Sequence, residues 1–223
     1  MEWKRRAAEA AVDRVEDGMV LGLGTGSTVR YAIERLGRRV AEGWELAGVP
    51  TSRATAELAR ELQIPLTTLD EHPSLDLTID GADEVDPRLD LIKGLGGALL
   101  REKIVAAASE AFLVVVDEGK VVEGLGERAP LPVEVLPFGA RRTRSRLEAL
   151  GCEPTLRRAG EAPFRTDNGN YMIHCRFEGI ADPRELAGRL KEIPGVIEHG
   201  LFLEMADAVF VGTAAGVKEM GRP

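Results

Sequence analysis

The residues best suited to ligand chemistry lie in a glycine-rich turn, Gly22 to Thr28, with the sequence GLGTGST. The turn follows a short apolar run and opens a helical pattern, so free N–H groups at the start of that helix can face an anion. Its glycines let the backbone approach a ligand closely, and Ser27 adds a hydroxyl donor. The spacing is neither a P-loop nor G-x-G-x-x-G, so one phosphate or carboxylate fits better than a dinucleotide. A tight turn in which Ser27 only caps the helix is the alternative.

A second candidate is the acidic turn Asp80–Asp86, which reads DGADEVD and follows the apolar run Leu75–Ile79. Ligands of open α/β sheets bind beyond the carboxyl ends of strands, so these side chains are expected at such a site. Close carboxylates raise one another's pKa, which can leave one of them able to exchange protons. The turn contains no histidine and lacks EF-hand spacing, so we expect no metal site. A solvated acidic turn with an aspartate capping a helix is the alternative.

A third glycine-bearing turn, Lys93 to Gly97, follows the apolar run Leu89–Ile92 and precedes another helical pattern. A lysine held near Asp80 and Asp83 would keep its positive charge and could stabilise an oxyanion. A lysine at a strand end can equally be a solvated side chain. Glu102, further along the helix, is not distinguished by its sequence context from other helical glutamates.

The histidines and cysteines do not form a recognisable reactive group. Cys152 and Cys175 lie outside CxxC or zinc-type spacing and are interpreted as buried thiols. His72, His174 and His199 are scattered, with no nucleophile or carboxylate at ligand spacing. We expect His174 and His199 to be structural, and we find no sign of a Ser-His-Asp arrangement.

The composition favours a globular protein with neither a membrane nor a nucleic-acid partner. The chain has 223 residues, of which 44% are hydrophobic and 30% charged, and its formal net charge is −8. Such an acidic chain does not suit a general nucleic-acid or anionic-membrane partner. Its N-terminal segment is charged throughout, unlike a signal peptide, and no apolar run approaches the ~18 residues that span a bilayer. We therefore expect a soluble cytoplasmic protein.

Up to about residue 127, short apolar runs alternate with helical stretches. This alternation is typical of an α/β layer fold with a mainly parallel, Rossmann-like sheet. The expected strands are residues 18–23, 45–49, 64–69, 75–79, 89–92 and 111–116, and the expected helices are residues 2–16, 27–36, 52–62 and 97–108.

The pattern changes after residue 127, where Pro130, Pro132 and Pro137 interrupt the chain. Strands and two helices then alternate as in a small ferredoxin-like α+β domain. The end of the chain returns to a strand and a helix that could rejoin the first sheet. We expect an α/β catalytic domain of residues 1–127 plus 205–223 and a small inserted α+β domain of residues 128–204. The expected elements are strands 131–135, 153–157, 170–177, 196–203 and 208–212 and helices 140–150, 183–192 and 213–220.

The three turns resemble those of the A-type ribose-5-phosphate isomerases, in the same order and nearly end to end along the chain. The motifs that carry the resemblance are GTGST at 24–28, DGADEVD at 80–86 and KGLGGALLREK at 93–103. The resemblance implies an aldose–ketose isomerase that interconverts D-ribose 5-phosphate and D-ribulose 5-phosphate in the pentose phosphate pathway. It also implies no metal or organic cofactor and a homodimer or tetramer. Weaker support comes from residues 116–120, 131–135, 167–170 and 194–200.

The same resemblance assigns roles to individual residues. Glu102 matches the family's proton-transferring base, and Lys93, Asp80 and Asp83 complete the expected catalytic group. Leu95 departs from the family, which commonly has another glycine there. The expected substrate-binding residues are Thr25, Gly26, Ser27, Thr28, Asp80, Gly81, Ala82, Asp83, Lys93, Gly94, Leu95, Gly96 and Lys120.

Other classes of protein share a related α/β domain. A non-catalytic sugar-phosphate-sensing domain of a regulator, as in repressors of the deoxyribose type, would need a DNA-binding segment, and no helix-turn-helix precedes residue 18. An amino-sugar-phosphate deaminase or a CoA transferase would be another enzyme of the same broad fold, and no motif points to either. Lys93 and Glu102 together favour the isomerase.

Overall fold

The computed structural model describes residues 2–221, which form two compact units. The units differ from the expected domains at residues 83–100 and 121–127, which lie in the second unit rather than with the first, and at residue 204, which lies in the first unit. The first unit comprises the chain up to Ala82, Arg101–Lys120 and the chain from Glu204, and the second comprises Asp83–Leu100 and Val121–Leu203.

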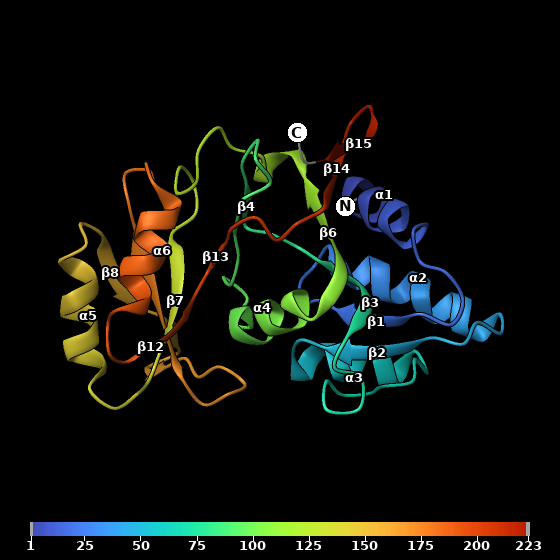
Figure 1. The fold of residues 1–223 in the computed structure, drawn as a ribbon, viewed down its shortest axis with the longest axis horizontal. Coiled ribbons are helices and arrows are strands. Elements are labelled where there is room, and N and C mark those ends of the chain that lie inside the picture. Colours follow the sequence, from blue (N-terminus) through green and yellow to red (C-terminus); the bar gives the residue numbers. More distant parts are fainter. Residues whose placement is uncertain (1, 222–223) are drawn as a thin grey trace. The chain divides into compact units, whose positions relative to one another are not determined.

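The first unit is built on a six-stranded sheet (Figure 1). Its strands are β1 (Val20–Leu23), β2 (Ala47–Pro50), β3 (Leu75–Asp80), β6 (Ser109–Asp117), β14 (Ala208–Thr213) and β15 (Gly216–Gly221). They follow the order β15-β14-β6-β3-β1-β2, and every pair is parallel except β14 with β15. The expected mainly parallel sheet, rejoined by the end of the chain, is therefore confirmed.

Helices cover both faces of this sheet. They are α1 (Glu2–Val12), α2 (Val29–Ala41), α3 (Arg53–Glu61) and α4 (Leu99–Ala107), with a short 3-10 helix η1 (Glu118–Lys120) after β6. Leu21 and Leu23 of β1 pack in the core formed with α1 and α2. Gly22 points to the opposite face, where an added Cβ would lie 2.6 Å from Val105 of α4. The sheet is thus buried between layers, as its near-continuous apolar strands predict.

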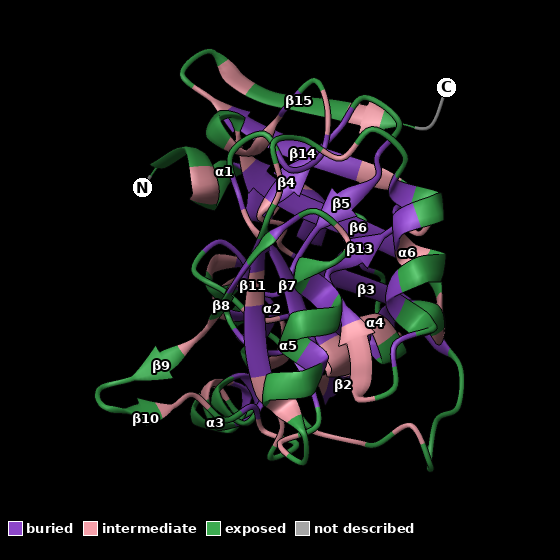
Figure 2. Cartoon of the chain, turned by 90° about the vertical axis from the view of Figure 1, so that its left-hand side faces the viewer, coloured by how far each residue is buried: buried purple, intermediate pink, exposed green. Residues whose placement is uncertain are grey.

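Two expected elements of the first unit are wrong. Residues 213–220 form the end of β14, a turn and most of β15 instead of a helix, because Thr213 and Gly216 close a tight turn. The Thr213 hydroxyl donates to the Gly216 carbonyl oxygen and accepts the Ala215 N–H, and Gly216 has a φ of +141°. The resulting edge strand is largely exposed (Figure 2). Residues 64–69 form only a single bridge, between Leu66 and Gly48, rather than a strand.

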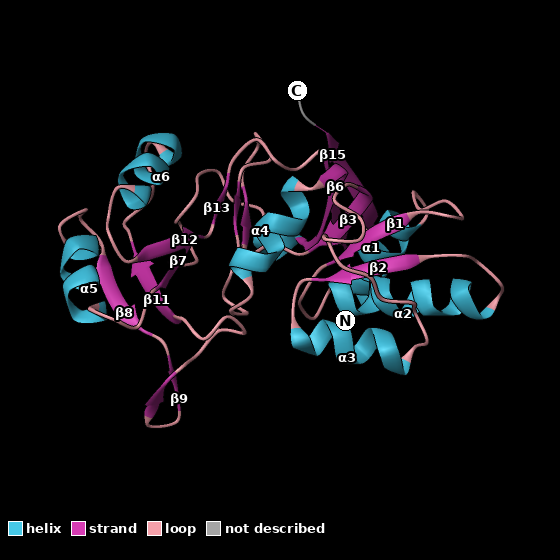
Figure 3. Cartoon of the chain, turned by 60° about the horizontal axis from the view of Figure 1, so that its bottom comes forward, coloured by secondary structure: helices cyan, strands magenta, loops and turns pink. Residues whose placement is uncertain are grey.

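The second unit contains a four-stranded antiparallel sheet with two helices on one face (Figure 3). The strands are β7 (Leu131–Val135), β8 (Glu153–Leu156), β11 (Tyr171–Arg176) and β12 (Val196–His199), and the helices are α5 (Ala140–Glu148) and α6 (Pro183–Lys191). The order β12-β7-β11-β8 is that of a ferredoxin-like domain, as predicted. Leu131 and Val133 of β7 pack with Leu147 and Leu190 of the helices, which leaves Glu134 on the opposite face.

A smaller three-stranded sheet, β13-β5-β4, completes the second unit. Its strands are β4 (Glu84–Val85), β5 (Leu91–Ile92) and β13 (Leu201–Phe202), and a separate hairpin pairs β9 (Arg158–Ala159) with β10 (Ala162–Pro163). The expected strand 196–203 is interrupted at Gly200, where an added Cβ would overlap the Lys93 carbonyl oxygen. Pairing of β5 with β13 places the third predicted turn in this unit. Within residues 2–221, no helix is long and apolar enough to cross a membrane.

Candidate active site

The first unit places the glycine-rich turn and the first three residues of the acidic turn at one edge of its sheet. β1 pairs with β2 on one side and with β3 on the other, so the strand order reverses at β1. In open α/β sheets, ligands bind beyond the carboxyl ends of the strands at such a switch point. The turn 24–28 follows β1 directly, and Asp80 ends β3. Thr25, Gly26, Ser27 and Thr28 therefore share this edge with Asp80, Gly81 and Ala82.

The Asp80 carboxylate holds the glycine-rich turn in place. Asp80 is fully buried, and its Oδ1 accepts the N–H of Thr25 at 3.0 Å and that of Gly81 at 2.7 Å. An added Cβ at Gly24 would lie 2.6 Å from the Cα of Asp80, so only glycine fits between the ends of the two strands. The Asp80 carboxylate and the absence of a side chain at Gly24 thus set how closely the first two motifs approach each other in space.

The hydroxyl groups of the turn point in different directions. Thr25 Oγ1 lies 2.7 Å from Thr51 Oγ1 and 2.8 Å from Ser52 Oγ, in a polar cluster at the start of α3. Ser27 is exposed. The N-cap residue of α2 is Thr28, and its side chain makes no capping hydrogen bond. The alternative interpretation, a turn whose Ser27 only caps the helix, is therefore not supported.

Two lysines lie at the same edge, one expected and one not. Lys120 belongs to η1, which follows β6, the neighbour of β3. Lys4 Nζ donates to Ser27 Oγ at 3.2 Å and lies 3.6 Å from Asp117 Oδ2. The sequence does not single out Lys4, because the helical pattern of α1 does not show which loop its first turn adjoins.

Glu102 is a buried carboxylate in the first turn of α4. Only 3% of the residue is exposed, whereas Glu110, a short distance along the chain, is exposed. A negative charge in the first turn is favoured by the helix dipole, and burial of a carboxylate is costly unless partners bind it. Burial is therefore the signal that distinguishes Glu102 from other helical glutamates, and the sequence alone does not contain it.

The second unit brings Asp83 together with the turn from Lys93 to Gly96. The Asp83 N–H donates to the Ile92 carbonyl oxygen at 2.7 Å, and its Oδ2 accepts the Leu95 N–H at 2.9 Å. Lys93 is 2% exposed, and its Nζ lies 5.3 Å from the centre of the Phe202 ring. Asp83 thus fixes the backbone two residues after the lysine.

Leu95 fits this turn without backbone strain. Gly94 and Gly97 have φ values of +110° and +95°, where other residues are strained, but Leu95 is not among the residues with positive φ. Its side chain packs against the hydrophobic core of the second unit. Leucine is therefore compatible with the backbone conformation that this turn adopts.

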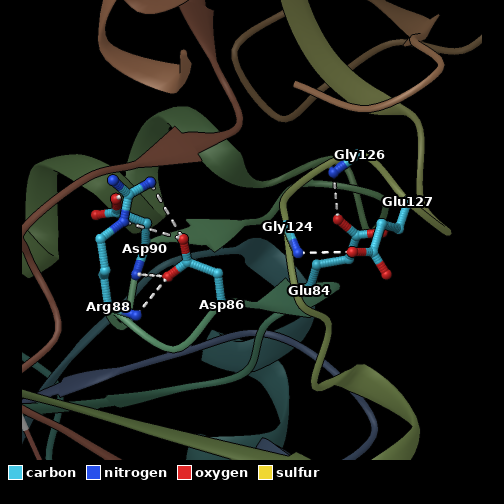
Figure 4. A network of polar contacts seen from close by, with 7 residues as sticks. All are labelled: Glu84, Asp86, Arg88, Asp90, Gly124, Gly126 and Glu127. Carbon is cyan, nitrogen blue, oxygen red and sulfur yellow. Dashed lines mark hydrogen bonds and ion pairs between the residues drawn. The ribbon is translucent and has the colours of Figure 1, made fainter. Parts of the chain in front are cut away.

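The remaining carboxylates of the acidic turn are structural (Figure 4). Glu84 is 1% exposed, and its carboxylate accepts the backbone N–H groups of Gly126, Arg128 and Ala129, each at 2.6 Å. Asp86 Oδ1 accepts the backbone N–H groups of Arg88 and Asp90, at 2.8 and 2.9 Å. The acidic motif therefore combines two candidate site residues, Asp80 and Asp83, with two that hold loops.

One histidine and one cysteine of the second unit have local hydrogen-bond partners, whereas His174 Nε2 is buried without one among the described residues. His199 Nδ1 accepts the Leu201 N–H at 3.3 Å, and the Cys152 thiol donates to the Leu147 carbonyl oxygen at 3.3 Å. Cys175 is also buried and unlinked. Across residues 2–221, no group of three His, Cys, Asp or Glu side chains could hold a metal ion.

The comparison with known families agrees with this geometry. The model of the family described as ribose 5-phosphate isomerase A (phosphoriboisomerase A) matches residues 47–216. The chain belongs to this family. The ribose-5-phosphate isomerase A of Roseiflexus castenholzii is 56% identical over 225 residues, covering 99% of the chain and 96% of the relative. That of Thermomicrobium roseum is 51% identical, covering 98% and 93%. The resemblance seen in the sequence motifs is thus confirmed.

Solved structures of the family share the fold. Ribose 5-phosphate isomerase A of Methanocaldococcus jannaschii superposes with a TM-score of 0.95 at 44% identity, covering 99% of the chain and 98% of that protein. A D-ribose-5-phosphate isomerase in complex with phospho-erythronic acid superposes with a TM-score of 0.96 at 43% identity, with the same coverage. The α/β fold inferred from the alternation of strands and helices is that of the family.

Proposed function

We propose that the chain interconverts D-ribose 5-phosphate and D-ribulose 5-phosphate by proton transfer between C1 and C2. The observation that carries this is the 56% identity to a ribose-5-phosphate isomerase A over 99% of the chain. A fold alone would not suffice, because α/β folds host many unrelated reactions. The buried Glu102 and the turns at the switch point of the sheet supply groups suited to this chemistry.

The substrate phosphate does not react, and we assign it the role of holding the substrate. The start of α2 and the exposed Ser27 supply hydrogen-bond donors, and Lys4 and Lys120 supply positive charge. These local groups offset the net charge of −8, which otherwise repels an anionic substrate. Binding of the phosphate can then align the sugar carbons for reaction.

Proton transfer is assigned to Glu102. Its carboxylate removes the proton from C2 of open-chain ribose 5-phosphate, and the electron pair forms the C1–C2 double bond of an enediolate with the negative charge on O1. Return of the proton to C1, as the O2 hydroxyl loses its proton to O1 and O2 becomes the carbonyl, gives ribulose 5-phosphate. A positioned base contributes about 10²–10⁴-fold, so the charge on O1 must also be stabilised.

Stabilisation of the enediolate oxygen is assigned to Lys93. Loss of one such donor typically costs about 2.7–4 kcal/mol of transition-state stabilisation. Asp83 holds the Leu95 N–H and so keeps the backbone beside Lys93 in place. We further assign Asp80 and Asp83 to the sugar hydroxyls and to the opening of the furanose ring, since the sugar arrives mainly in ring form.

A ligand of a related structure supports an enediolate route. The D-ribose-5-phosphate isomerase that was solved with phospho-erythronic acid is 43% identical to this chain. By its name this ligand is a phosphorylated four-carbon aldonic acid, whose carboxylate resembles the two oxygens of an enediolate. A site that is complementary to the enediolate is expected to bind such an anion tightly.

The proposal extends to assembly and location. By resemblance to the family, we propose that the chain works without a metal or organic cofactor, as a homodimer or tetramer, in the cytoplasm. Asp80 and Glu102 belong to the first unit, and Asp83 and Lys93 belong to the second.

The substitution Glu102→Gln tests the assignment of the base. The amide keeps the shape of the side chain but cannot accept the proton, so we expect kcat on ribose 5-phosphate to fall by about 10²–10⁴-fold with little change in KM. Chelator-treated protein is used, and Glu110→Gln, at an exposed position of β6, serves as the control that keeps the wild-type rate. Near-normal kcat in Glu102→Gln would remove this residue from the role. A wild-type chain that makes no ribulose 5-phosphate would instead favour a non-catalytic sensing domain.

A further inference from the structure

Two side chains of the second unit, Arg157 and Phe164, contact the turn that carries Lys93. Arg157 follows β8, and its Nη1 donates to the Leu95 carbonyl oxygen at 2.8 Å. Phe164 follows β10, and the centre of its ring lies 3.7 Å from the Arg157 guanidinium carbon. Both residues belong to the second unit, as does the turn itself.

Leu95 is bound on both sides of its backbone. Its N–H donates to Asp83 Oδ2 at 2.9 Å, and its carbonyl oxygen accepts from Arg157 at 2.8 Å. Two residues later, an added Cβ at Gly97 would lie 2.6 Å from the Phe164 ring and 2.9 Å from Arg157 Nη1. The guanidinium and the ring therefore pack directly on the backbone of the turn.

Arg157 and Phe164 are themselves held by backbone hydrogen bonds. The Arg157 N–H donates to the Met172 carbonyl oxygen, and the Phe164 N–H donates to the Arg157 carbonyl oxygen, each at 2.9 Å. Burial lowers the pKa of Arg157, because its guanidinium is partly withdrawn from water. A cationic donor in such surroundings makes a stronger hydrogen bond than one in bulk solvent.

A buried carboxylate anchors the chain just beyond Phe164. Glu134 is fully buried, and its Oε1 accepts the Thr166 hydroxyl at 2.9 Å and the Asn170 side-chain amide at 2.8 Å. The segment that presents Phe164 to the turn is therefore fixed at its far end. Rigid support of this kind is what a catalytic group needs to keep its position.

We propose that Arg157, stacked on Phe164, is a positioning residue for the isomerase reaction and acts through the backbone of the 93–97 turn on Lys93. This inference rests on the proposed function, because it matters only if Lys93 stabilises the enediolate. Displacement of a catalytic group by about 1 Å can cost about 10²-fold in rate. Loss of the Arg157 contacts therefore reduces kcat, while phosphate binding in the first unit keeps KM nearly unchanged.

The main test is Arg157→Met, which keeps the length of the side chain but removes its donors and charge. We expect kcat to fall about 10–100-fold with KM within about threefold of the wild type. Arg157→Lys, which restores charge and one donor, should recover part of the loss. The matched control is Arg158→Met, because the neighbouring Arg158 is exposed and its side chain donates within its own hairpin, to the Glu161 carbonyl oxygen.

A double-mutant cycle separates positioning through Lys93 from a general structural effect. If Arg157 acts through Lys93, then Arg157→Met should reduce kcat far less when Lys93→Met is already present. If the double variant loses kcat by the product of the two single fold-changes, the proposal is overturned. An unchanged kcat in Arg157→Met would overturn it as well. If Arg157→Met does not fold, the same cycle with Phe164→Leu decides the question. An active wild type with an unaffected Arg157→Met refutes this inference alone, whereas an inactive wild type refutes the proposed function.

Discussion

His174 lies on β11 in surroundings that disfavour its positive charge. Burial lowers its pKa below the ordinary value of 6.5, the positive charge of Arg157 lowers it further, and Asp83 opposes these two effects. The arginine that contacts the Leu95 carbonyl oxygen thus also favours a neutral imidazole nearby. At the scale of single residues, the charged side chains of Arg157 and Asp83 therefore influence both His174 and the turn that carries Lys93.

The lowered pKa predicts how stability depends on pH. Because the folded chain binds this proton less readily than the unfolded chain, the contribution of His174 is fully present above the unfolded pKa of 6.5 and is lost as pH falls through the lower folded pKa. We expect His174→Gln to flatten the decrease in the free energy of unfolding between about pH 7.5 and about pH 5. Urea titrations at both pH values measure this, with His72→Gln, at an exposed position, as the control. Equal slopes in wild type and His174→Gln would contradict the account.

The sequence identified some site residues by mechanism and others only by family. Asp80 and the turn 25–28 could be predicted, because polar residues after apolar strands lie at the ligand-binding edge of a parallel sheet. Glu102 could not be found in this way, since its burial depends on how α4 packs. Lys4 was missed for a similar reason, because its contact with Ser27 joins elements whose packing the helical pattern does not reveal.

At the scale of elements, the site depends on strand ends that approach more closely than side chains allow. The glycine-rich turn meets the end of β3 at Gly24, where an added Cβ would lie 2.6 Å from the Asp80 Cα. Backbone atoms cannot move aside as a flexible side chain can. The glycine is therefore required by packing between β1 and β3, quite apart from any ligand.

Gly24→Ala should consequently weaken both stability and binding. We expect the free energy of unfolding to fall by about 1–3 kcal/mol, as for other overpacked sites, and KM for ribose 5-phosphate to rise. Gly188→Ala is the matched control, because Gly188 lies in α6 with open space around it, and there alanine should stabilise by about 0.5–1 kcal/mol. Urea unfolding and steady-state kinetics measure both variants. A Gly24→Ala protein as stable as the wild type would contradict the packing argument.

The elements that sequence analysis missed or mistook are short or stabilised by distant partners. Apolar periodicity correctly placed the parallel strands and the four-stranded domain, because each buries a face against a core. The strands β4, β9 and β10 have two residues each, which is too few to show a period. β15 was mistaken for a helix, because residues 217–220 have no type that strongly disfavours a helix. Pairing with β14 decides their conformation instead.

At the scale of the whole molecule, the division of the chain into two units differs from the expected domains. The expected domain of residues 1–127 contained Asp80, Asp83, Lys93 and Glu102 together, whereas the structure divides them between units. The sequence could not show this, because the pairing of β5 with β13 joins residues about a hundred positions apart. Long-range pairing of short strands leaves no local signal.

Assembly is a prediction at this same scale. We expect sedimentation equilibrium to give two or four times the 24.1 kDa mass of one chain. Exposed apolar side chains such as Phe138 and Ile104 are consistent with contact between copies, since an apolar residue in water favours burial. A mass of a single chain across a range of concentrations would contradict the homo-oligomer.

The most direct measurement is the fate of solvent hydrogen during turnover. Chelator-treated protein is incubated with ribose 5-phosphate in deuterated water, and the product is analysed by mass spectrometry and NMR. The enediolate route through Glu102 predicts ribulose 5-phosphate with solvent deuterium at C1, at less than one atom per molecule where the abstracted proton returns before exchange. Ketose formed at the wild-type rate with no deuterium at C1 would contradict proton transfer through an exchangeable carboxylate.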